Sequence, residues 1–217
     1  DAIIWDGGNN DFSFIESDLY IVVADPHRAG HELLYHPGET NLRMADVVIV
    51  NKIDSAKKDD IKKVITNTKS VNPKAEIILA KSVVTVDYPS LIKGKSVLVV
   101  EDGPTLTHGG MPYGAGTVAA KKYGCKIIDA RKYAVGSIKD LYKKYAHLEK
   151  ELPAMGYSKK QIAELEKTIN AVKCDAVIDA TPVTLPRLIK INKPVAQVDY
   201  ELEEVGKINL KKILEKF

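Results

Sequence analysis

The sequence lacks most features that mark secreted, membrane or metal-stapled proteins. Its 217 residues include 2 cysteines, Cys125 and Cys174, which lie far apart and outside any C-x-x-C or Cys/His pattern. We therefore expect free thiols, with neither a disulfide framework nor a structural zinc site. No apolar run approaches the roughly 18 residues that a membrane-spanning helix needs, and no signal-peptide pattern opens the chain. These absences favour a cytoplasmic globular protein that does not engage a membrane.

Excess charge of one sign is also lacking. The chain has 32 basic and 29 acidic side chains, a net charge of +3, spread along its length without a basic stripe. This pattern argues against nucleic acid as a partner. Glutamine is scarce whereas lysine, glutamate and isoleucine are abundant, a bias typical of proteins from very hot environments. The chain begins with Asp1 and enters an apolar run at once, so we expect a processed or truncated piece of a longer polypeptide.

Short β-branched runs alternate with helical stretches along the whole chain. This order predicts an α/β fold with a mostly parallel sheet and helices on both of its faces. The apolar continuity of the runs indicates buried strands. The expected strands are Ile3–Trp5, Leu19–Ala24, Val47–Val50, Ile77–Leu79, Val97–Val100, Lys126–Asp129, Ala176–Asp179 and Val195–Val198.

A composition break at residues 89–95 divides the chain into two expected regions. Residues 1–92 form a partial P-loop GTPase-like region, and residues 93–217 form a second, Rossmann-like α/β region. Three helix starts are predicted from capping residues: Ser55, Asn209, and Ser158 with Gln161 as a capping box.

The most informative motif is the tetrad from Asn51 to Asp54, N-K-I-D, directly after an apolar strand. A carboxylate such as Asp54 can accept both the ring N–H and the exocyclic amine of guanine, two donors that adenine does not present together on that edge. The stem of Lys52 can lie across the base, and Asn51 can tie the loop to its surroundings. The motif predicts guanine recognition, although a polar loop after a strand is the alternative.

The next strand is expected to end in a loop at Ala80 and Lys81. The backbone N–H of Ala80 can donate to the guanine carbonyl, so we include Ala80 and Lys81 in the predicted nucleotide site. The two loops together make the guanine interpretation stronger than the tetrad alone.

Asp6 follows the first apolar run and precedes two glycines. An acid there is typical of sites that hold Mg²⁺ next to a γ-phosphate, so Asp6 is the candidate metal ligand and a candidate catalytic residue. The alternative is a plain Asp-Gly turn.

A phosphate-binding loop of the form G-x-x-x-x-G-K-[ST] occurs nowhere in the chain. Because phosphate contacts supply much of the affinity for a nucleotide, we expect this chain alone to bind GTP weakly and to hydrolyse it negligibly.

The segment from Asp25 to Asn41 is rich in histidine and follows an expected strand. His27, Arg28 and His31 can donate charge-assisted hydrogen bonds to an anionic ligand. We take His27 and Arg28 as candidate catalytic residues, and His31 and Glu32 as candidate substrate or anion ligands. A polar connecting loop is an equal alternative, and a metal site is disfavoured because Gly30 argues against a helix there.

A second glycine-rich segment runs from Glu101 to Gly116. Glycines at a strand-to-helix turn let the backbone approach a ligand, and helix N–H groups can then face an anion. The candidate anion ligands are Thr105, Thr107, His108 and Gly109. A long surface loop is the alternative.

Several of these motifs together resemble the cyclic 2,3-diphosphoglycerate synthetase family and its GTPase-like relatives. They are D-G-G-N-N-D from Asp6, D-P-H-R-x-G-H-E from Asp25, P-G-E-T-N from Pro37, N-K-I-D from Asn51 and E-D-G-P-T-L-T-H-G from Glu101. The resemblance runs nearly end to end, but it covers only the C-terminal half of such proteins. Their N-terminal region carries the phosphate-binding loop that this chain lacks.

The resemblance implies a ligase that uses GTP or ATP with Mg²⁺ to close a phosphoanhydride in a phosphorylated small molecule. The missing N-terminal segment, or a second copy, is then a partner, and this chain alone is inactive. The alternatives are a regulatory or assembly GTPase acting on a protein partner, and a structural remnant that dimerises through an exposed sheet edge.

Overall fold

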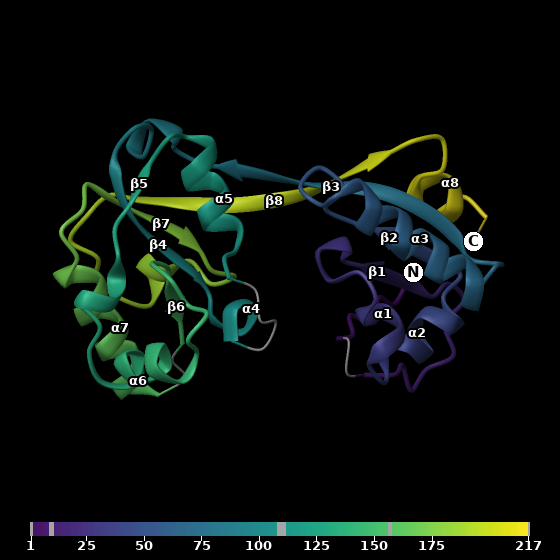
Figure 1. Ribbon diagram of the computed structural model, residues 1–217, viewed down its shortest axis with the longest axis horizontal. Coiled ribbons are helices and arrows are strands. Elements are labelled where there is room, and N and C mark those ends of the chain that lie inside the picture. Colours follow the sequence, from purple (N-terminus) through teal and green to yellow (C-terminus); the bar gives the residue numbers. More distant parts are fainter. Residues whose placement is uncertain (1, 9–10, 108–111, 156–157, 217) are drawn as a thin grey trace. The chain divides into compact units, whose positions relative to one another are not determined.

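The computed structural model describes residues 2–8, 11–107, 112–155 and 158–216. The chain divides into two compact units, coloured by sequence in Figure 1: unit 1 is Asp1–Val83 with Glu201–Phe217, and unit 2 is Val84–Tyr200. The six strand pairs with a defined register, two in unit 1 and four in unit 2, are parallel. The predicted α/β fold with a mostly parallel sheet is therefore confirmed.

The sheet of unit 1 is built from β1 (Ile21–Ala24), β2 (Val47–Val50) and the first part of β3 (Glu76–Val86). β2 lies between the other two strands. Its helices are α1 (His31–Leu34), α2 (Gly38–Met44), α3 (Lys58–Val71) and α8 (Leu210–Leu214), with a 3-10 turn at Pro26–Arg28.

Strand β2 explains why unit 1 has helices on both faces. Its four residues are all buried, and alternate side chains of a strand point to opposite faces. Val48 and Val50 pack with Val64 of α3, whereas Val47 and Ile49 pack with Ile213 of α8. The C-terminal helix therefore completes the core of unit 1.

Unit 2 has the strand order β8-β7-β4-β5, with β6 beside the last residues of β4. Leu98 on β4 packs with α6 and α7 on one face, and Val99 packs with α5 on the other. The strands are β4 (Ser96–Asp102), β5 (Lys126–Ile127), β6 (Leu152–Ala154), β7 (Ala176–Ala180) and β8 (Val195–Val205), and the helices are α4 (Gly103–Thr107), α5 (Ala115–Lys122), α6 (Gly136–Lys144) and α7 (Lys159–Ala171).

The strand predicted at Ile3–Trp5 is wrong. Residues 2–8 form no regular element, and the side chains of Ile3 and Ile4 are 88% and 91% exposed. A strand needs a neighbour to satisfy its backbone groups, and no strand in the described ranges pairs with this segment.

The helix caps give a mixed result. Ser158 and Gln161 form the predicted capping box, and the Asn209 side chain accepts from the backbone N–H of Lys212. The Ser55 cap is wrong, because α3 begins at Lys58 and its first turn has no side-chain cap. No helix in the described part of the chain is long and apolar enough to cross a membrane.

The boundary proposed between residues 92 and 93 stays a prediction. The contact-based units place residues 201–217 with the first stretch of the chain, because Ile213 packs against its sheet.

Tight packing at Gly116 gives the first test. A methyl group on this residue would lie 2.7 Å from Val99 Cγ1 and 3.0 Å from Ala180 Cβ, both on the sheet of unit 2. Gly116→Ala should lower the free energy of unfolding by about 1–3 kcal/mol in a urea titration, since overpacking forces its neighbours apart. Gly38→Ala is the control, because nothing lies within 4 Å of the added methyl group. Equal effects of the two substitutions would contradict this packing.

Candidate functional site

The N-K-x-D tetrad lies at the carboxyl end of β2 and is held from both sides. Parallel register places Ala24 opposite Val50, so the segments that follow β1 and β2 emerge together. The N–H of Asn51 donates to the carbonyl of Ala24 at 3.0 Å, and the N–H of Ile53 donates to the carbonyl of Ala80 at 3.1 Å. The tetrad is thus fixed to both neighbouring strands.

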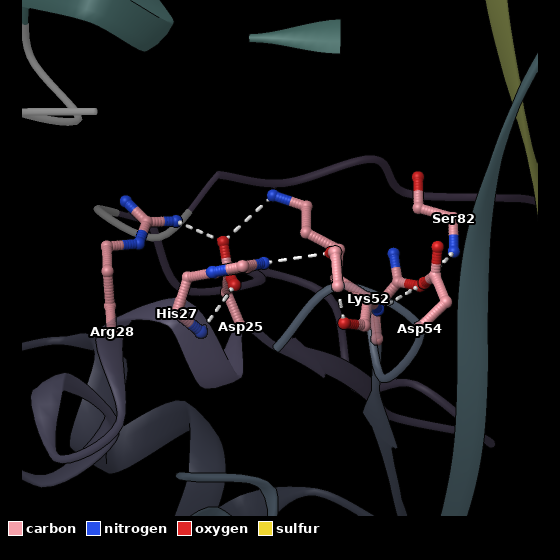
Figure 2. A network of polar contacts seen from close by, with 8 residues as sticks. Asp25, His27, Arg28, Lys52, Asp54 and Ser82 are labelled. Atoms are coloured by element: carbon pink, nitrogen blue, oxygen red, sulfur yellow. Dashed lines mark hydrogen bonds and ion pairs between the residues drawn. The ribbon is translucent and has the colours of Figure 1, made fainter. Parts of the chain in front are cut away.

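Lys52 is restrained at both its backbone and its ammonium group (Figure 2). Its φ angle is 56°, in the left-handed region that non-glycine residues seldom adopt. Its N–H donates to Asn51 Oδ1 at 2.8 Å. Its Nζ lies 2.9 Å from Asp25 Oδ2. The Asn51 side chain therefore holds the backbone of its own neighbour, while Asp25 holds the end of the lysine side chain. The predicted role of Asn51, to tie the loop to its surroundings, stays a prediction.

Asp25 is the centre of this network, and the sequence analysis missed it as a site residue. Its Oδ2 also lies 3.3 Å from Arg28 Nη2, and its Oδ1 accepts from the N–H of His27 at 3.0 Å. The only signal was its position at a strand end, opposite Asn51. Seeing the contact with Lys52 required the register of β1 on β2.

The pKa of the Asp25 carboxyl is lowered from its ordinary value of 3.8. Burial is the largest single influence and raises the pKa, but the hydrogen bond and charge of Lys52, the N–H of His27 and the charge of Arg28 together outweigh it. The carboxylate is therefore charged at neutral pH. Its contribution to stability is fully present above the ordinary aspartate pKa and is lost as pH falls through the lower, folded value.

Asp54 is exposed at the end of the tetrad, and its Oδ1 accepts from the N–H of Ser82 at 3.2 Å. The loop predicted at Ala80 and Lys81 is wrong, because β3 continues through both residues to Val86. Ala80 is 0% exposed. Lys81 Nζ lies 2.6 Å from Glu203, which raises the pKa of Lys81. Asp54 thus meets Ser82 of β3, and the base contacts assigned to Ala80 and Lys81 stay predictions.

Only part of the histidine-rich segment lies close to the tetrad. His27 Nε2 lies 2.9 Å from Ser55 Oγ, directly after Asp54. Gly30, at a φ of 108°, separates the 3-10 turn at Pro26–Arg28 from α1, so His27 and His31 share no helical face, as predicted. The ring of His31 packs on Tyr35. The carboxylate of Glu32 accepts from the Gly30 N–H and from Asn67 Nδ2 at 2.7 and 2.6 Å. His31 and Glu32 therefore have packing partners of their own within unit 1.

Asp6 lies in the exposed segment 2–8. The described residues contain no group of three or more His, Cys, Asp or Glu side chains that could hold a metal ion. Mg²⁺ usually takes one or two carboxylates and completes its shell with phosphate and water. The role of Asp6 as a Mg²⁺ ligand therefore stays a prediction.

In unit 2, residues 114–117 surround the buried carboxyl group of Glu101. Glu101 is 1% exposed, and its carboxylate accepts from the N–H groups of Gly114, Gly116 and Thr117 at 3.1, 3.1 and 2.8 Å. Burial raises the pKa of Glu101, and these three donors only partly offset the effect. The N–H groups that the sequence analysis assigned to a ligand anion are thus bound to a carboxylate of the chain.

The other candidate anion ligands in this segment are turned to local partners or lie outside the described residues. Thr105 donates through its N–H and Oγ1 to Asp102 Oδ2, at 3.1 and 2.7 Å. Thr107 is buried and donates to the carbonyl of Gly103 at 2.9 Å. His108 and Gly109 lie outside the described residues.

Part of unit 1 is similar to a known family of nucleotide-binding domains. Residues 4–79 match the family model of the CobW/HypB/UreG nucleotide-binding domain. The matched stretch contains β1, β2, the tetrad and the start of β3. The first part of the chain is therefore similar to a nucleotide-binding domain.

Two curated relatives extend this finding. The chain is 65% identical, over 100% of its length, to Arginine synthetase ArcE of Thermococcus kodakarensis, and spans 49% of that protein. A stretch of 107 residues, 48% of the chain, is 29% identical to the Cyclic 2,3-diphosphoglycerate synthetase of Thermococcus sibiricus, and spans 24% of it. The resemblance drawn from the motifs is confirmed in part. The chain is similar to a protein of that name over 48% of its length, not nearly end to end, and it spans half or less of the length of each relative.

Asp179 gives a test of unit 2. It is 0% exposed at the end of β7, and its carboxylate accepts from the N–H groups of Thr181 and Leu185 at 3.1 and 2.7 Å. Asp179→Ala should lower the free energy of unfolding by about 1–3 kcal/mol, because it leaves buried donors without an acceptor. Asp140→Ala, at an exposed ion pair with Lys143, should change it by less than about 0.5 kcal/mol. Matching urea midpoints for the two variants would contradict the anchoring role of Asp179.

Proposed function

We propose that unit 1 is the base-recognising half of a guanine-nucleotide site, and that the protein is part of a nucleotide-dependent synthetase. The observation that carries this proposal is the exposed carboxylate of Asp54, fixed at a strand end beside a restrained Lys52.

The polar groups match guanine better than adenine. Guanine offers a ring N–H and an exocyclic amine on one edge, and a carboxylate accepts both. One oxygen of Asp54 receives a hydrogen bond from Ser82, so the side chain is oriented, and a carboxylate keeps further lone pairs for a ligand. The stem of Lys52 supplies the flat contact with the base. GTP is therefore the proposed nucleotide, with ATP as the alternative.

Phosphate binding is the part that this chain does not supply by itself, because no phosphate-binding loop occurs in its sequence. We propose that an N-terminal segment of the longer protein, or a second copy, provides the loop. Arg28 and His27 lie on the same edge of the sheet as the tetrad, and cationic donors there can offset the charge that develops during phosphoryl transfer. Asp6 would hold Mg²⁺ on the phosphates, where the ion bridges phosphate oxygens and neutralises their charge.

The synthetase assignment rests on the two relatives. One is named for arginine and the other for cyclic 2,3-diphosphoglycerate. Both are called synthetases, but the products in their names differ. We propose a ligase and treat the acceptor as a small molecule that the nucleotide activates by phosphorylation. Thr105, Thr107, His108, Gly109, His31 and Glu32 stay candidates for its recognition. A regulatory GTPase acting on a protein is the second candidate. The 65% sequence identity to a protein named as a synthetase, over the whole chain, favours the ligase.

Base selectivity can be tested on the 217-residue chain by calorimetric titration with GDP, ADP and xanthosine diphosphate. Wild type should bind GDP weakly and in preference to ADP. Asp54→Asn should weaken GDP binding about 10- to 100-fold, because an amide cannot accept two hydrogen bonds as a carboxylate does. The same variant should gain affinity for the xanthine nucleotide, whose oxo group accepts from the amide.

The control is Asp59→Asn, which removes an exposed carboxylate from the first turn of α3 and should leave all three affinities unchanged. Equal binding of GDP and ADP that Asp54→Asn does not alter would exclude a guanine site here.

A further inference from the structure

We propose that Asp25 is the positioning residue of the base site: it holds the Lys52 ammonium so that the lysine stem is already in place when a base arrives. This inference rests on the proposed function and assigns a role to a residue outside the N-K-x-D motif.

The geometry fixes Lys52 at its two ends. The backbone end is held by Asn51, whose Oδ1 accepts from the Lys52 N–H at 2.8 Å, with φ at 56°. The ammonium end is held by Asp25 at 2.9 Å, from the neighbouring strand. A side chain tied at both ends keeps its four-carbon stem in one place, and that stem is the part proposed to contact the base.

Asp25 is well placed to act as a fixed anchor. Its side chain is 13% exposed, against 38% for that of Lys52. Its other oxygen accepts from the N–H of His27, where Asp25 caps the 3-10 turn that follows β1. Arg28 shares the oxygen that binds Lys52, at 3.3 Å. The carboxylate therefore also links the base-contacting lysine to the guanidinium of Arg28 and to the backbone of His27, two residues proposed for the phosphate end.

The expected effect on GDP affinity is moderate. A positioning contact changes only how much rotamer freedom the lysine side chain loses when the ligand binds. A free lysine loses rotamer freedom when a ligand immobilises it, whereas a lysine already held loses little. Removing the Asp25 contact should therefore weaken GDP binding roughly 2- to 10-fold.

The substitution Asp25→Asn removes the ion pair with Lys52 but keeps the cap of the 3-10 turn. Asparagine caps a helical turn about as well as aspartate, so the bond from the His27 N–H is kept while the charge that holds Lys52 is removed. Asp129→Asn is the matched control: Asp129 also caps a 3-10 turn, accepting from the Arg131 N–H at 3.0 Å, and pairs with the Arg131 guanidinium at 2.6 Å, in unit 2.

The test is a double-mutant cycle on GDP affinity with Lys52→Met, which keeps an apolar stem without the ammonium. Asp25→Asn should weaken GDP binding 2- to 10-fold in the wild-type background and have almost no further effect in the Lys52→Met background, since coupled residues are not additive. Asp129→Asn should leave the affinity unchanged. An equal loss in both backgrounds, or no loss in either, would overturn the role of Asp25.

A second measurement does not depend on nucleotide binding. Carbon-13 relaxation at Lys52 Cε should show a restricted side chain in the wild type and a mobile one in Asp25→Asn, without ligand. Equal mobility in the two proteins overturns the inference even if GDP binds. Restricted motion in a wild type that binds no nucleotide would instead support the contact and count against the proposed function.

Discussion

The parallel pairing of β1, β2 and β3 is the constraint on which the candidate site depends. β2 is buried on both faces, and burying four valine and isoleucine side chains contributes roughly 1.5–3 kcal/mol each. Its register with β1 sets Ala24 opposite Val50, and that alignment alone brings Asp25 beside Lys52. The register with β3 brings Asp54 to Ser82. The polar network at this edge is thus positioned by an apolar strand that carries none of its chemistry.

The sequence predicted the parts of this arrangement that are local. The apolar run at Val47–Val50 and the tetrad after it were recognisable because each is a continuous stretch with its own chemistry. The role of Asp25 was not, because it depends on which residue of another strand lies opposite. The Ser55 hydroxyl does not cap α3 because it has other partners: it donates to the carbonyl of Lys52 at 3.3 Å and lies 2.9 Å from His27 Nε2.

Strand lengths were the other weak point. The predicted end of a strand at Leu79 followed the last strongly apolar residue, but β3 continues to Val86. Lys81 and Ser82 remain in the strand and bond to Glu203 and Asp54, so polar side chains do not mark a strand's end when they have partners. At Ile3–Trp5 the opposite happened: an apolar run forms no strand in the described residues, because backbone pairing decides strand formation.

In unit 2, a sequence pattern typical of anion binding stabilises the fold, because its N–H groups donate to a carboxylate of the same chain. The N–H groups of Gly114, Gly116 and Thr117, at the start of α5, were expected to face a ligand anion, but all three donate to Glu101. A carboxylate at a helix N-terminus gains from both the unpaired N–H groups and the helix dipole. Gly114 and Gly116 are needed in part because a side chain at either position would meet Glu101.

The most direct test of a guanine site built from the segments after β1 and β2 and from the middle of β3 uses the base without its phosphates. Two-dimensional NMR of the chain titrated with guanosine and with adenosine reports which backbone amides sense each nucleoside. We predict that guanosine shifts the amides of residues 25–28, 51–55 and 80–82, and that adenosine leaves them largely unchanged. Guanosine shifts confined to unit 2, or identical shifts with the two nucleosides, would contradict it.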